Sequence, residues 1–337
     1  MNVLVTGGAG YIGSHTVLEL LEGGHQVVVL DNLSNSCLQA VRRVEQLAGR
    51  KVRFVEGDVR DAALLAQLFA AEPIDAVLHF AGLKAVGESL DNPLEYYSNN
   101  VAGTLTLCQT MAAAGVFRLV FSSSATVYGE PASMPVSEAC PTVEPTNPYG
   151  RSKLVVEHLL QDLQRSDPRW AIGLLRYFNP IGAHASGLIG EDPLGVPNNL
   201  LPYVCQVAIG KLECLWVHGN DYPTVDGTCV RDYIHVVDLA TGHLRALEFL
   251  CGQPGCHIWN LGTGQGHSVL EVVRAFEQAA GCAAQYQIGP RRAGDIAASW
   301  ADPNKALREL GWKAERGLGQ MLVDAWRWQN QNPQGYR

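Results

Sequence analysis

Short apolar runs alternate with longer segments of helical periodicity through the first half of this chain. Strands are predicted where apolar and β-branched residues run together, at residues 3–6, 26–30, 51–55, 75–79, 118–121 and 171–176. Helices are predicted between these runs, from the first glycine turn to about Leu21 and near residues 62–70, 94–114 and 149–163. This alternation predicts an α/β fold with a doubly wound parallel sheet, which binds ligands at the carboxyl ends of its strands.

A glycine-rich turn, Gly7-Gly-Ala-Gly10-Tyr-Ile-Gly13, follows the first predicted strand and leads into the first predicted helix. Glycines at such a turn let backbone N–H groups approach a pyrophosphate at the helix N-terminus. The spacing here is G-x-x-G-x-x-G rather than G-x-G-x-x-G. The context of strand, turn and helix favours a Rossmann-type dinucleotide site over a plain glycine turn, which is the alternative.

The second predicted strand ends in Asp31, 18 residues beyond Gly13. A carboxylate at this place accepts hydrogen bonds from the adenosine ribose hydroxyls and repels a 2′-phosphate. NAD is therefore favoured over NADP. The alternative is that Asp31 only opens the turn at residues 32–35.

The regular alternation breaks at about Ile181 into turns rich in glycine and proline, such as residues 187–197. We therefore expect a dinucleotide-binding domain at residues 1–180 and a smaller α/β substrate domain at residues 181–337. The chain is expected to return towards the first domain near residues 231–261. Residues 303–310 and 318–329 are predicted to form amphipathic helices, with Trp312, Trp326 and Trp328 on packing faces.

Composition limits the function class. The chain has 337 residues, of which 47% are hydrophobic and 17% charged, so it is long enough to bury a large core. The net charge of −8 argues against a nucleic-acid partner. No signal peptide or apolar run of membrane-spanning length is found, so we expect no membrane association and a cytoplasmic location. Nine cysteines without Cys-x-x-Cys spacing indicate reduced thiols, and the ten histidines show no metal-binding spacing, so no metal is assigned.

One helix start combines a tyrosine with a lysine. Asn147-Pro148 predicts the start, because asparagine caps helices and proline favours the first helical position. Tyr149 and Lys153 then lie at i and i+4 on one helical face. At roughly 4 Å and an effective dielectric constant near 20, an ammonium group favours a phenolate by about 4 kcal/mol, or about three pKa units. The spacing therefore predicts that Lys153 lowers the pKa of Tyr149 and makes it a general base.

With these motifs in place, the chain resembles the UDP-glucose (UDP-galactose) 4-epimerase family of the extended short-chain dehydrogenases/reductases. The matching segments run from end to end of the chain and comprise residues 3–15, 31–36, 79–89, 121–129, 148–153, 175–180, 197–200 and 227–236. The resemblance implies an isomerase that interconverts UDP-glucose and UDP-galactose through a 4-keto intermediate, with tightly bound NAD. It also implies a homodimer formed by the helices at residues 99–111 and 149–163.

The resemblance also implies roles for individual residues. Tyr149 is the base that removes the sugar 4-OH proton, Lys153 lowers its pKa and holds the nicotinamide ribose, and Ser124 hydrogen-bonds the reacting oxygen. The positions that match cofactor contacts are Gly7, Gly10, Tyr11, Ile12, Gly13, Asp31, Asn32, Leu33, Asn35, Ser36, Asp58, Val59, Phe80, Ala81, Gly82, Lys84, Asn99, Ser122, Tyr149, Lys153, Tyr177 and Phe178. The positions that match substrate contacts are Lys84, Ser124, Tyr149, Phe178, Asn179, Asn199, Leu200, Trp216, His218, Arg231, Tyr233, Arg292, Asp295 and Ser299.

Structural roles remain open for some of these residues. Taken alone, Ser124 is equally consistent with a helix cap. Asn99 is equally consistent with a buried amide whose hydrogen bonds are made within the protein. An exposed arginine is usually only solvated, although Arg231 and Arg292 suit a diphosphate by charge-assisted hydrogen bonding.

Two other functions are considered. Sugar-nucleotide dehydratases resemble this chain but carry an Asp-Glu pair where it has Ala125-Thr126, and neither of these side chains supplies an acid or a base for loss of water. A dehydratase or a 4-keto-forming oxidoreductase is therefore the alternative enzyme. A non-catalytic NAD-binding regulator is the alternative from another class.

Two departures from the family pattern concern the substrate site. Trp216 and His218 lie where many relatives place a small apolar residue and then an aromatic residue beside the uracil. Ser299 lies where narrow-specificity relatives carry a tyrosine that closes the sugar pocket. A small residue there predicts that UDP-N-acetylglucosamine and UDP-N-acetylgalactosamine are also substrates, and the alternative is that Ser299 is a neutral surface change.

Overall fold

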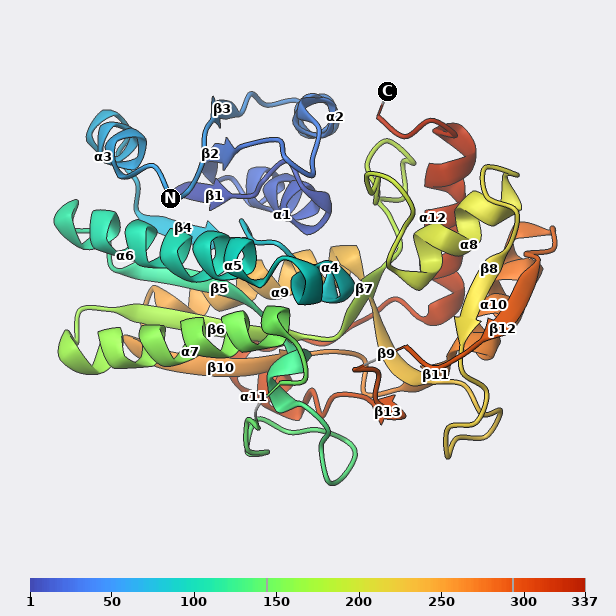
Figure 1. Ribbon diagram of the computed structural model, residues 1–337. Coiled ribbons are helices and arrows are strands. Elements are labelled where there is room, and N and C mark those ends of the chain that lie inside the picture. The colour runs from blue at the N-terminus through green and yellow to red at the C-terminus, as the bar shows by residue number, and fades with distance from the viewer. Residues whose placement is uncertain (144, 293, 337) are drawn as a thin grey trace.

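A seven-stranded, wholly parallel sheet forms the centre of the larger part of the molecule (Figure 1). The computed structural model describes residues 1–143, 145–292 and 294–336. The strand order is β10-β6-β5-β4-β1-β2-β3. These strands are β1 (Asn2–Thr6), β2 (Gln26–Asp31), β3 (Arg53–Glu56), β4 (Ala76–His79), β5 (Arg118–Ser124), β6 (Ala171–Tyr177) and β10 (Gly255–Leu261). The predicted fold class is thereby confirmed.

Helices cover both faces of this sheet. They are α1 (Tyr11–Glu22), α2 (Leu38–Ala48), α3 (Ala62–Ala71), α4 (Val86–Asp91), α5 (Pro93–Tyr96), η1 (Tyr97–Ala102), α6 (Gly103–Ala113), η2 (Ala125–Tyr128), α7 (Pro148–Ser166) and α9 (Val236–Leu250). On one face, α1, α2 and α9 bury apolar side chains such as Val17, Val41 and Leu239 against the strands. On the other face, α3, α6 and α7 bury side chains such as Leu65 and Leu107. Sequence-distant α9 therefore completes one layer of this unit.

The six predicted strands are all present, and no strand end differs from its prediction by more than three residues. The helix α7 begins as predicted, because the Asn147 side chain accepts a 2.9 Å hydrogen bond from Gly150 N and Pro148 occupies the first turn. The helix predicted at residues 94–114 is confirmed, since residues 93–113 are helical without a break. It consists of α5, the π-helix η1 and α6, and η1 contains Asn99 and Asn100, which are both buried.

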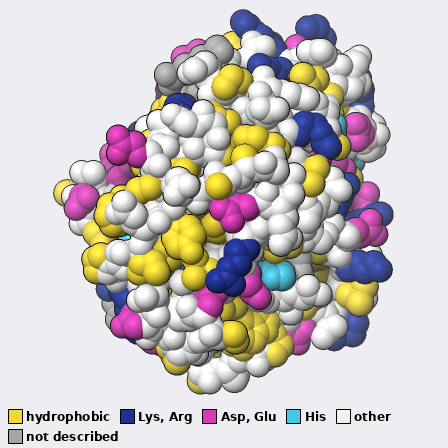
Figure 2. Space-filling model, turned by 90° about the vertical axis from the view of Figure 1, so that its right-hand side faces the viewer, with side chains coloured by type: hydrophobic (Ala, Val, Ile, Leu, Met, Phe, Trp, Pro, Cys, Tyr) yellow, Lys and Arg dark blue, Asp and Glu magenta, His cyan; other side chains and the backbone are white. Residues whose placement is uncertain are grey.

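The remaining described residues build two small sheets and four helices, at the right of Figure 1. The strands are β7 (Asn179–Ile181), β8 (Leu215–His218), β9 (Val230–His235), β11 (Gly266–Ser268), β12 (Tyr286–Gly289) and β13 (Ala298–Ser299). The helices are α8 (Leu200–Ala208), α10 (Val269–Ala280), α11 (Asn304–Leu310) and α12 (Leu318–Gln331). Figure 2 shows acidic and basic side chains intermixed with hydrophobic ones on this side of the molecule.

The tryptophans predicted on packing faces are confirmed there. Trp312 and Trp328 are buried, and the Trp326 ring packs edge-on against Phe276 at 5.6 Å. Of the helices that the described residues form, none combines the length and the apolar character needed to span a bilayer.

Candidate active site

The backbone of the glycine turn between β1 and α1 is closely packed. Gly7 has a φ of +71°, and a Cβ there would lie 2.6 Å from Ala81 N. A Cβ on Gly13 would lie 2.2 Å from the Gly7 carbonyl oxygen. Gly10 precedes α1 and contributes no side-chain cap, so the N–H groups of Tyr11 and Ile12 begin the helix without one. This is the arrangement that an anionic pyrophosphate requires.

Asp31, at the end of β2, holds this turn and the next loop together. Its Oδ2 accepts a 2.9 Å hydrogen bond from Ala9 N, and its Oδ1 accepts from Leu33 N at 2.9 Å and from Ser36 Oγ at 2.7 Å. The turn-opening role considered from the sequence is therefore real. A carboxylate offers about four acceptor sites, so three donors leave room for one more.

The loops after β2 and β3 meet at Asp58. Its carboxylate accepts from Asn32 Nδ2 at 3.1 Å and pairs with Arg60 at 2.8 Å. Hydrogen bonds from Arg60 lower the pKa of Asp58 to about 2. Val59 is buried beneath this loop, and Asn35 and Ser36 lie in the loop that precedes α2.

The loop after β4, which comprises Phe80 to Lys84, is held by an asparagine that the sequence analysis missed. Asn100 Oδ1 accepts from Leu83 N at 2.8 Å, and Asn100 Nδ2 donates to Leu83 O at 3.0 Å. Asn99, the predicted cofactor contact, donates to Asn100 Oδ1 at 3.0 Å. The buried amide of Asn99 therefore has a structural partner, as the alternative reading expected.

Tyr149, Lys153 and Ser124 are brought together at the carboxyl end of β5. Tyr149 and Lys153 are both buried on α7, and Lys153 Nζ donates a 2.8 Å hydrogen bond to the Ser122 carbonyl oxygen. Ser124 also caps η2, since its Oγ accepts from Thr126 N at 3.2 Å and from Thr126 Oγ1 at 3.0 Å. Ser124 therefore both caps η2 and lies beside Tyr149.

The pKa values at this site differ from the expectation. Burial raises the pKa of Tyr149, and hydrogen bonding to Ser124 lowers it. Burial also lowers the pKa of Lys153 to about 8, opposed by the charge of Glu157. Burial thus dominates the pKa of Tyr149 in the protein on its own, because desolvation disfavours both charged forms, and the contribution expected from Lys153 stays a prediction.

Tyr177 and Phe178 lie next to this group, at the end of β6, and pack in different apolar clusters. The Tyr177 hydroxyl is hydrogen-bonded to Ser122 Oγ, and burial raises the pKa of Tyr177. The buried His243 ring lies 4.7 Å from the Phe80 ring and 5.9 Å from the Tyr177 ring. Phe178 is buried at the end of β6. His243 was not among the site residues predicted from the sequence.

An acidic residue links the two halves of the molecule at this edge. Glu191 Oε1 pairs with Lys84 Nζ at 3.2 Å and accepts from Asn199 Nδ2 at 2.7 Å. Asn199 immediately precedes α8, whose first residue is Leu200. Lys84 Nζ also lies 6.0 Å above the ring of Tyr11, whose hydroxyl donates to Gly182 O at 2.7 Å.

Most of the remaining predicted substrate contacts lie around β9. The Asp295 carboxylate accepts from Arg292 at 2.9 Å and lies 3.8 Å from Arg231. In the parallel pair of β13 and β9, Ser299 lies opposite Arg231. Tyr233 is buried opposite Asn179 of β7. Because neighbouring strands set these registers, residues far apart in the chain converge here.

Trp216 and His218 both point outward from β8. Leu215 and Val217 of the same strand are buried, whereas the exposed fraction of Trp216 is 47%. A Cβ on Gly289 of the neighbouring strand would lie 3.2 Å from the Trp216 ring. The uracil-facing role expected for these two residues stays a prediction.

Two buried carboxylates that the sequence analysis missed support the site. Glu157 accepts from Ser123 Oγ at 2.5 Å and pairs with Arg176 at 2.6 Å. It lies four residues after Lys153, so the helical spacing that joins Tyr149 to Lys153 contains the signal. Asp232, between Arg231 and Tyr233, accepts from Thr263 N at 2.9 Å and from Ala301 N at 3.1 Å, and so anchors the segment after Ser299.

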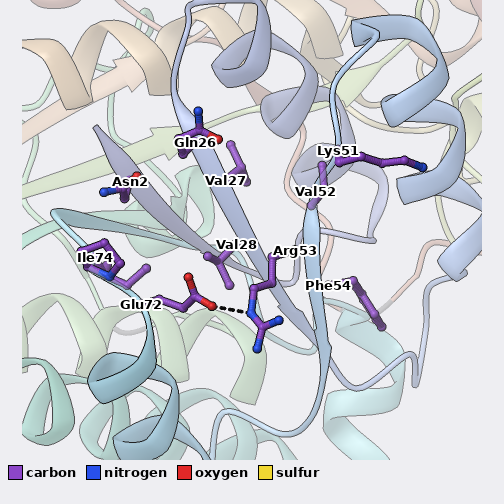
Figure 3. Close-up of a pocket in the computed structure, with 11 residues that line it drawn as sticks. Asn2, Gln26, Val27, Val28, Lys51, Val52, Arg53, Phe54, Glu72 and Ile74 are labelled. Atoms are coloured by element: carbon purple, nitrogen blue, oxygen red, sulfur yellow. Dashed lines mark ion pairs between the residues drawn. The ribbon is translucent and has the colours of Figure 1, made fainter.

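A cavity of about 510 Å³ lies at the opposite end of the sheet (Figure 3). Asn2, Gln26 and Val52 line it where β1, β2 and β3 begin, and an ion pair of 2.5 Å joins Arg53 to Glu72 beside it. It is therefore separate from the carboxyl ends of these strands. Over the described parts of the chain, no group of three histidine, cysteine or acidic side chains is placed to hold a metal ion.

Comparison with known proteins agrees with this geometry. The GDP-mannose 4,6 dehydratase family model matches residues 4–325. The UDP-glucose 4-epimerase of Haemophilus influenzae is 60% identical over 337 residues, which cover all of both chains.

Solved structures are also similar to this chain over its full length. The crystal structure of UDP-glucose 4-epimerase from Bifidobacterium longum in complex with NAD+ and UDP has a TM-score of 0.98 and 55% identity, and covers 99% of this chain and 100% of that one. The enzyme from Stenotrophomonas maltophila, with bound NAD and formylated UDP-arabinopyranose, has a TM-score of 0.96 and 54% identity, and covers 99% of each chain.

Proposed function

This chain belongs to the UDP-glucose 4-epimerase family, and from that premise we propose which of its residues carry the reaction. The protein is an isomerase that interconverts UDP-glucose and UDP-galactose by epimerisation at C4, with NAD as its cofactor. The observation that supports our assignment of residues is the grouping of Tyr149, Lys153 and Ser124 at the end of β5, two strands from the glycine turn and at the same edge of the parallel sheet.

NAD fits the residues of the first half. The glycine turn offers backbone N–H groups to its pyrophosphate, and Asp31 keeps one acceptor site for a ribose hydroxyl. NAD supplies a reversible hydride acceptor for sugar C4 and, when oxidised, a positively charged ring. Residues 80–84, Asn99 and Phe178 complete the proposed cofactor site.

Tyr149 is proposed to accept the proton of the sugar 4-OH and to return it when the 4-keto sugar is reduced. Its burial raises its pKa, so positive charge around the closed site has to favour the phenolate. The Lys153 ammonium supplies part of that charge, and Ser124 hydrogen-bonds the reacting oxygen. Both proposals are consistent with the side-chain positions at the end of β5.

Epimerisation also requires that the sugar present either face to the cofactor. We assign the diphosphate to Arg231 and Arg292, with Asn179, Asn199 and Tyr233 as further nucleotide or sugar contacts. A diphosphate held by two arginines leaves the 4-keto sugar free to swing about it between the two transfers.

Loss of water is not favoured by this site. The two positions at which dehydratases carry an acidic pair hold Ala125 and Thr126, which form the start of η2. The assay that tests the proposal supplies purified protein with UDP-galactose and no added cofactor. UDP-glucose, detected by NMR, supports epimerisation. A 4-keto or 6-deoxy product would indicate a dehydratase, and no turnover a regulatory protein.

We also propose which parts of the chain bind the cofactor and which bind the substrate. We assign NAD to residues 1–180, with returns near residues 231–261, and the UDP-sugar to residues 181–337. The return is supported by β10, which pairs with β6 in the large sheet. All nine cysteines are free, which is consistent with the proposed cytoplasmic location.

We further propose a homodimer formed through α6 and α7. Leu105 of α6 and Val155 of α7 are exposed by 43% and 41%, so apolar side chains lie on the outer faces of both helices. Sedimentation should give twice the chain mass, and Val155→Asp should shift it towards the monomer.

A further inference from the structure

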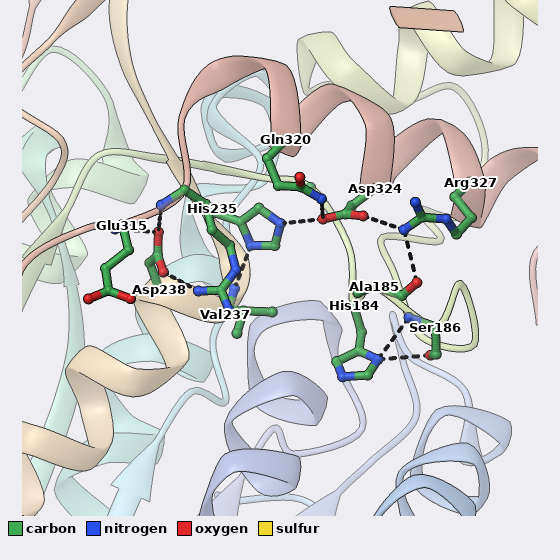
Figure 4. A network of polar contacts seen from close by, with 12 residues as sticks. His184, Ala185, Ser186, His235, Val237, Asp238, Glu315, Gln320, Asp324 and Arg327 are labelled. Carbon is green, nitrogen blue, oxygen red and sulfur yellow. Dashed lines mark hydrogen bonds and ion pairs between the residues drawn. The ribbon is translucent and has the colours of Figure 1, made fainter.

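The last turn of α12 and the chain that follows it hold one loop of the substrate half by its backbone. Arg327 Nη1 donates to Ala185 O at 2.9 Å, and Asn332 Nδ2 donates to Gly187 O at 2.9 Å. Figure 4 shows Asp324 and Arg327 of α12 facing this loop and His235. We call residues 327–336 the C-terminal clamp.

The clamp also holds the backbone around Glu191, the residue that pairs with Lys84 in the candidate site. The Tyr336 hydroxyl donates to Gly190 O at 3.2 Å and accepts from Gly190 N at 3.1 Å. Trp328 Nε1 donates to the backbone oxygen of Glu191 at 3.1 Å, and Tyr336 N donates to Asp192 Oδ2 at 2.9 Å. The backbone on both sides of Glu191 is therefore fixed by the clamp.

The clamp is also tied to the dinucleotide half. Arg43 of α2 donates from Nη1 to Leu188 O at 2.9 Å and to Asn332 Oδ1 at 2.7 Å. Its guanidinium lies 5.1 Å from the centre of the Tyr336 ring and 5.6 Å from that of Trp328. Figure 1 shows the C-terminal end of the chain between α2 and α12. The loop that carries Glu191 is thus held from both halves.

The clamp and the loop that carries Glu191 pack so closely that two positions require glycine. A Cβ on Gly190 would lie 2.3 Å from Trp328 Cγ, and a Cβ on Gly335 would lie 2.1 Å from Asp192 Oδ1. Gly335 also has a φ of +71°. Such an approach leaves the loop little freedom to shift without the clamp.

We propose that Glu191 and Tyr336 are positioning residues for the UDP-sugar, with the clamp fixing Glu191 and Glu191 fixing Lys84 and Asn199. The single carboxylate oxygen that bonds both of these side chains is 3.2 Å from Lys84 Nζ and 2.7 Å from Asn199 Nδ2. The Glu191 side chain is only 10% exposed and that of Lys84 is 46% exposed, so the carboxylate is enclosed while solvent partly screens the pair. The inference rests on the proposed function, because it takes Lys84 and Asn199 as substrate contacts.

The test compares Tyr336→Phe, Glu191→Gln and the double variant with the wild type. Tyr336→Phe removes only the hydroxyl and keeps the ring beside Arg43. We expect each single variant to raise KM for UDP-galactose about three- to tenfold, with kcat within about twofold and bound NAD unchanged. Because both residues act through one oxygen, the double variant should resemble Glu191→Gln alone. Titration with UDP in a calorimeter should show the same weakening without turnover.

Tyr286→Phe, at an exposed tyrosine of β12, is the matched control and should leave KM unchanged. A lower melting temperature of Tyr336→Phe with unchanged KM and unchanged UDP affinity would make the clamp merely structural and overturn the inference. Independent effects that multiply in the double variant would overturn it too. Failure of the wild type to form UDP-glucose would instead defeat the proposed function, and the UDP titration would still decide the inference.

Discussion

Lys153 Nζ donates a 2.8 Å hydrogen bond to the carbonyl oxygen of Ser122, and so joins the first turns of α7 to the end of β5. One bond fixes the ammonium at the edge of the sheet where Tyr149 and Ser124 also lie. The acceptor is a backbone oxygen, so the lysine is held in place whether or not its neighbours are ionised.

Tyr149→Phe should lower turnover of UDP-galactose by about 10²–10⁴-fold, because it removes the group that exchanges the proton. Bound NAD, measured in the supernatant of the denatured protein, and the melting temperature should stay close to those of the wild type. Tyr286→Phe provides the matched control, with unchanged turnover expected. Wild-type turnover of Tyr149→Phe would assign proton transfer to another group.

Lys153 makes stability depend on pH. Burial lowers its pKa from the ordinary value of 10.5 to about 8, so below pH 8 folding carries the full cost of burying the ammonium. That cost disappears as the pH rises from 8 to 10.5, where the unfolded chain holds the proton and the folded chain has released it. Relative to Lys153→Met, the wild type should therefore gain about 3 kcal/mol across this window. Urea unfolding of both proteins at a series of pH values measures the gain, and a constant difference would refute it.

Arg176→Met should destabilise the protein by about 3–5 kcal/mol, because it leaves the Glu157 carboxylate buried without its counter-charge. Arg176 and Glu157 are 4% and 0% exposed and lie 2.6 Å apart. Arg165→Met removes an exposed partner of Asp162 and should cost less than about 1 kcal/mol. Urea unfolding separates the two cases, and equal losses would contradict the assignment of a buried pair.

How far the sequence predicts this site depends on the range of each interaction. The glycine turn, Asp31 and the Tyr149–Lys153 pair are local patterns, and the structure has them at the expected elements. Asn100 and Glu191 were missed because their partners, Leu83 and Lys84, lie 17 and 107 residues away. The sign of the Tyr149 pKa shift was missed because spacing predicts which charges lie close together and says nothing about desolvation.

Gly13→Ala should reduce bound NAD at least about tenfold, because the new Cβ would lie 2.2 Å from the Gly7 carbonyl oxygen and 2.8 Å from Gly8 Cα. Both contacts are backbone, so the turn itself has to move. Gly319→Ala in α12 is the control, since a Cβ there meets nothing within 4 Å. Absorbance of the dinucleotide released per chain gives the measurement, and full NAD content in Gly13→Ala would remove the turn from the cofactor site.

Ser299→Tyr tests the breadth of the sugar pocket. We propose that the small side chain of Ser299 admits a 2-N-acetyl group, and its register opposite Arg231 supports a place beside the substrate diphosphate. A phenol at this position would fill that space, so turnover of UDP-N-acetylgalactosamine should fall at least about tenfold while turnover of UDP-galactose stays within about threefold. Ser166→Tyr, at the exposed end of α7, should change neither rate. Both rates are measured by NMR on the same preparations, and an equal loss of both activities in Ser299→Tyr would show that the tyrosine disturbs the site as a whole and would remove the specificity argument.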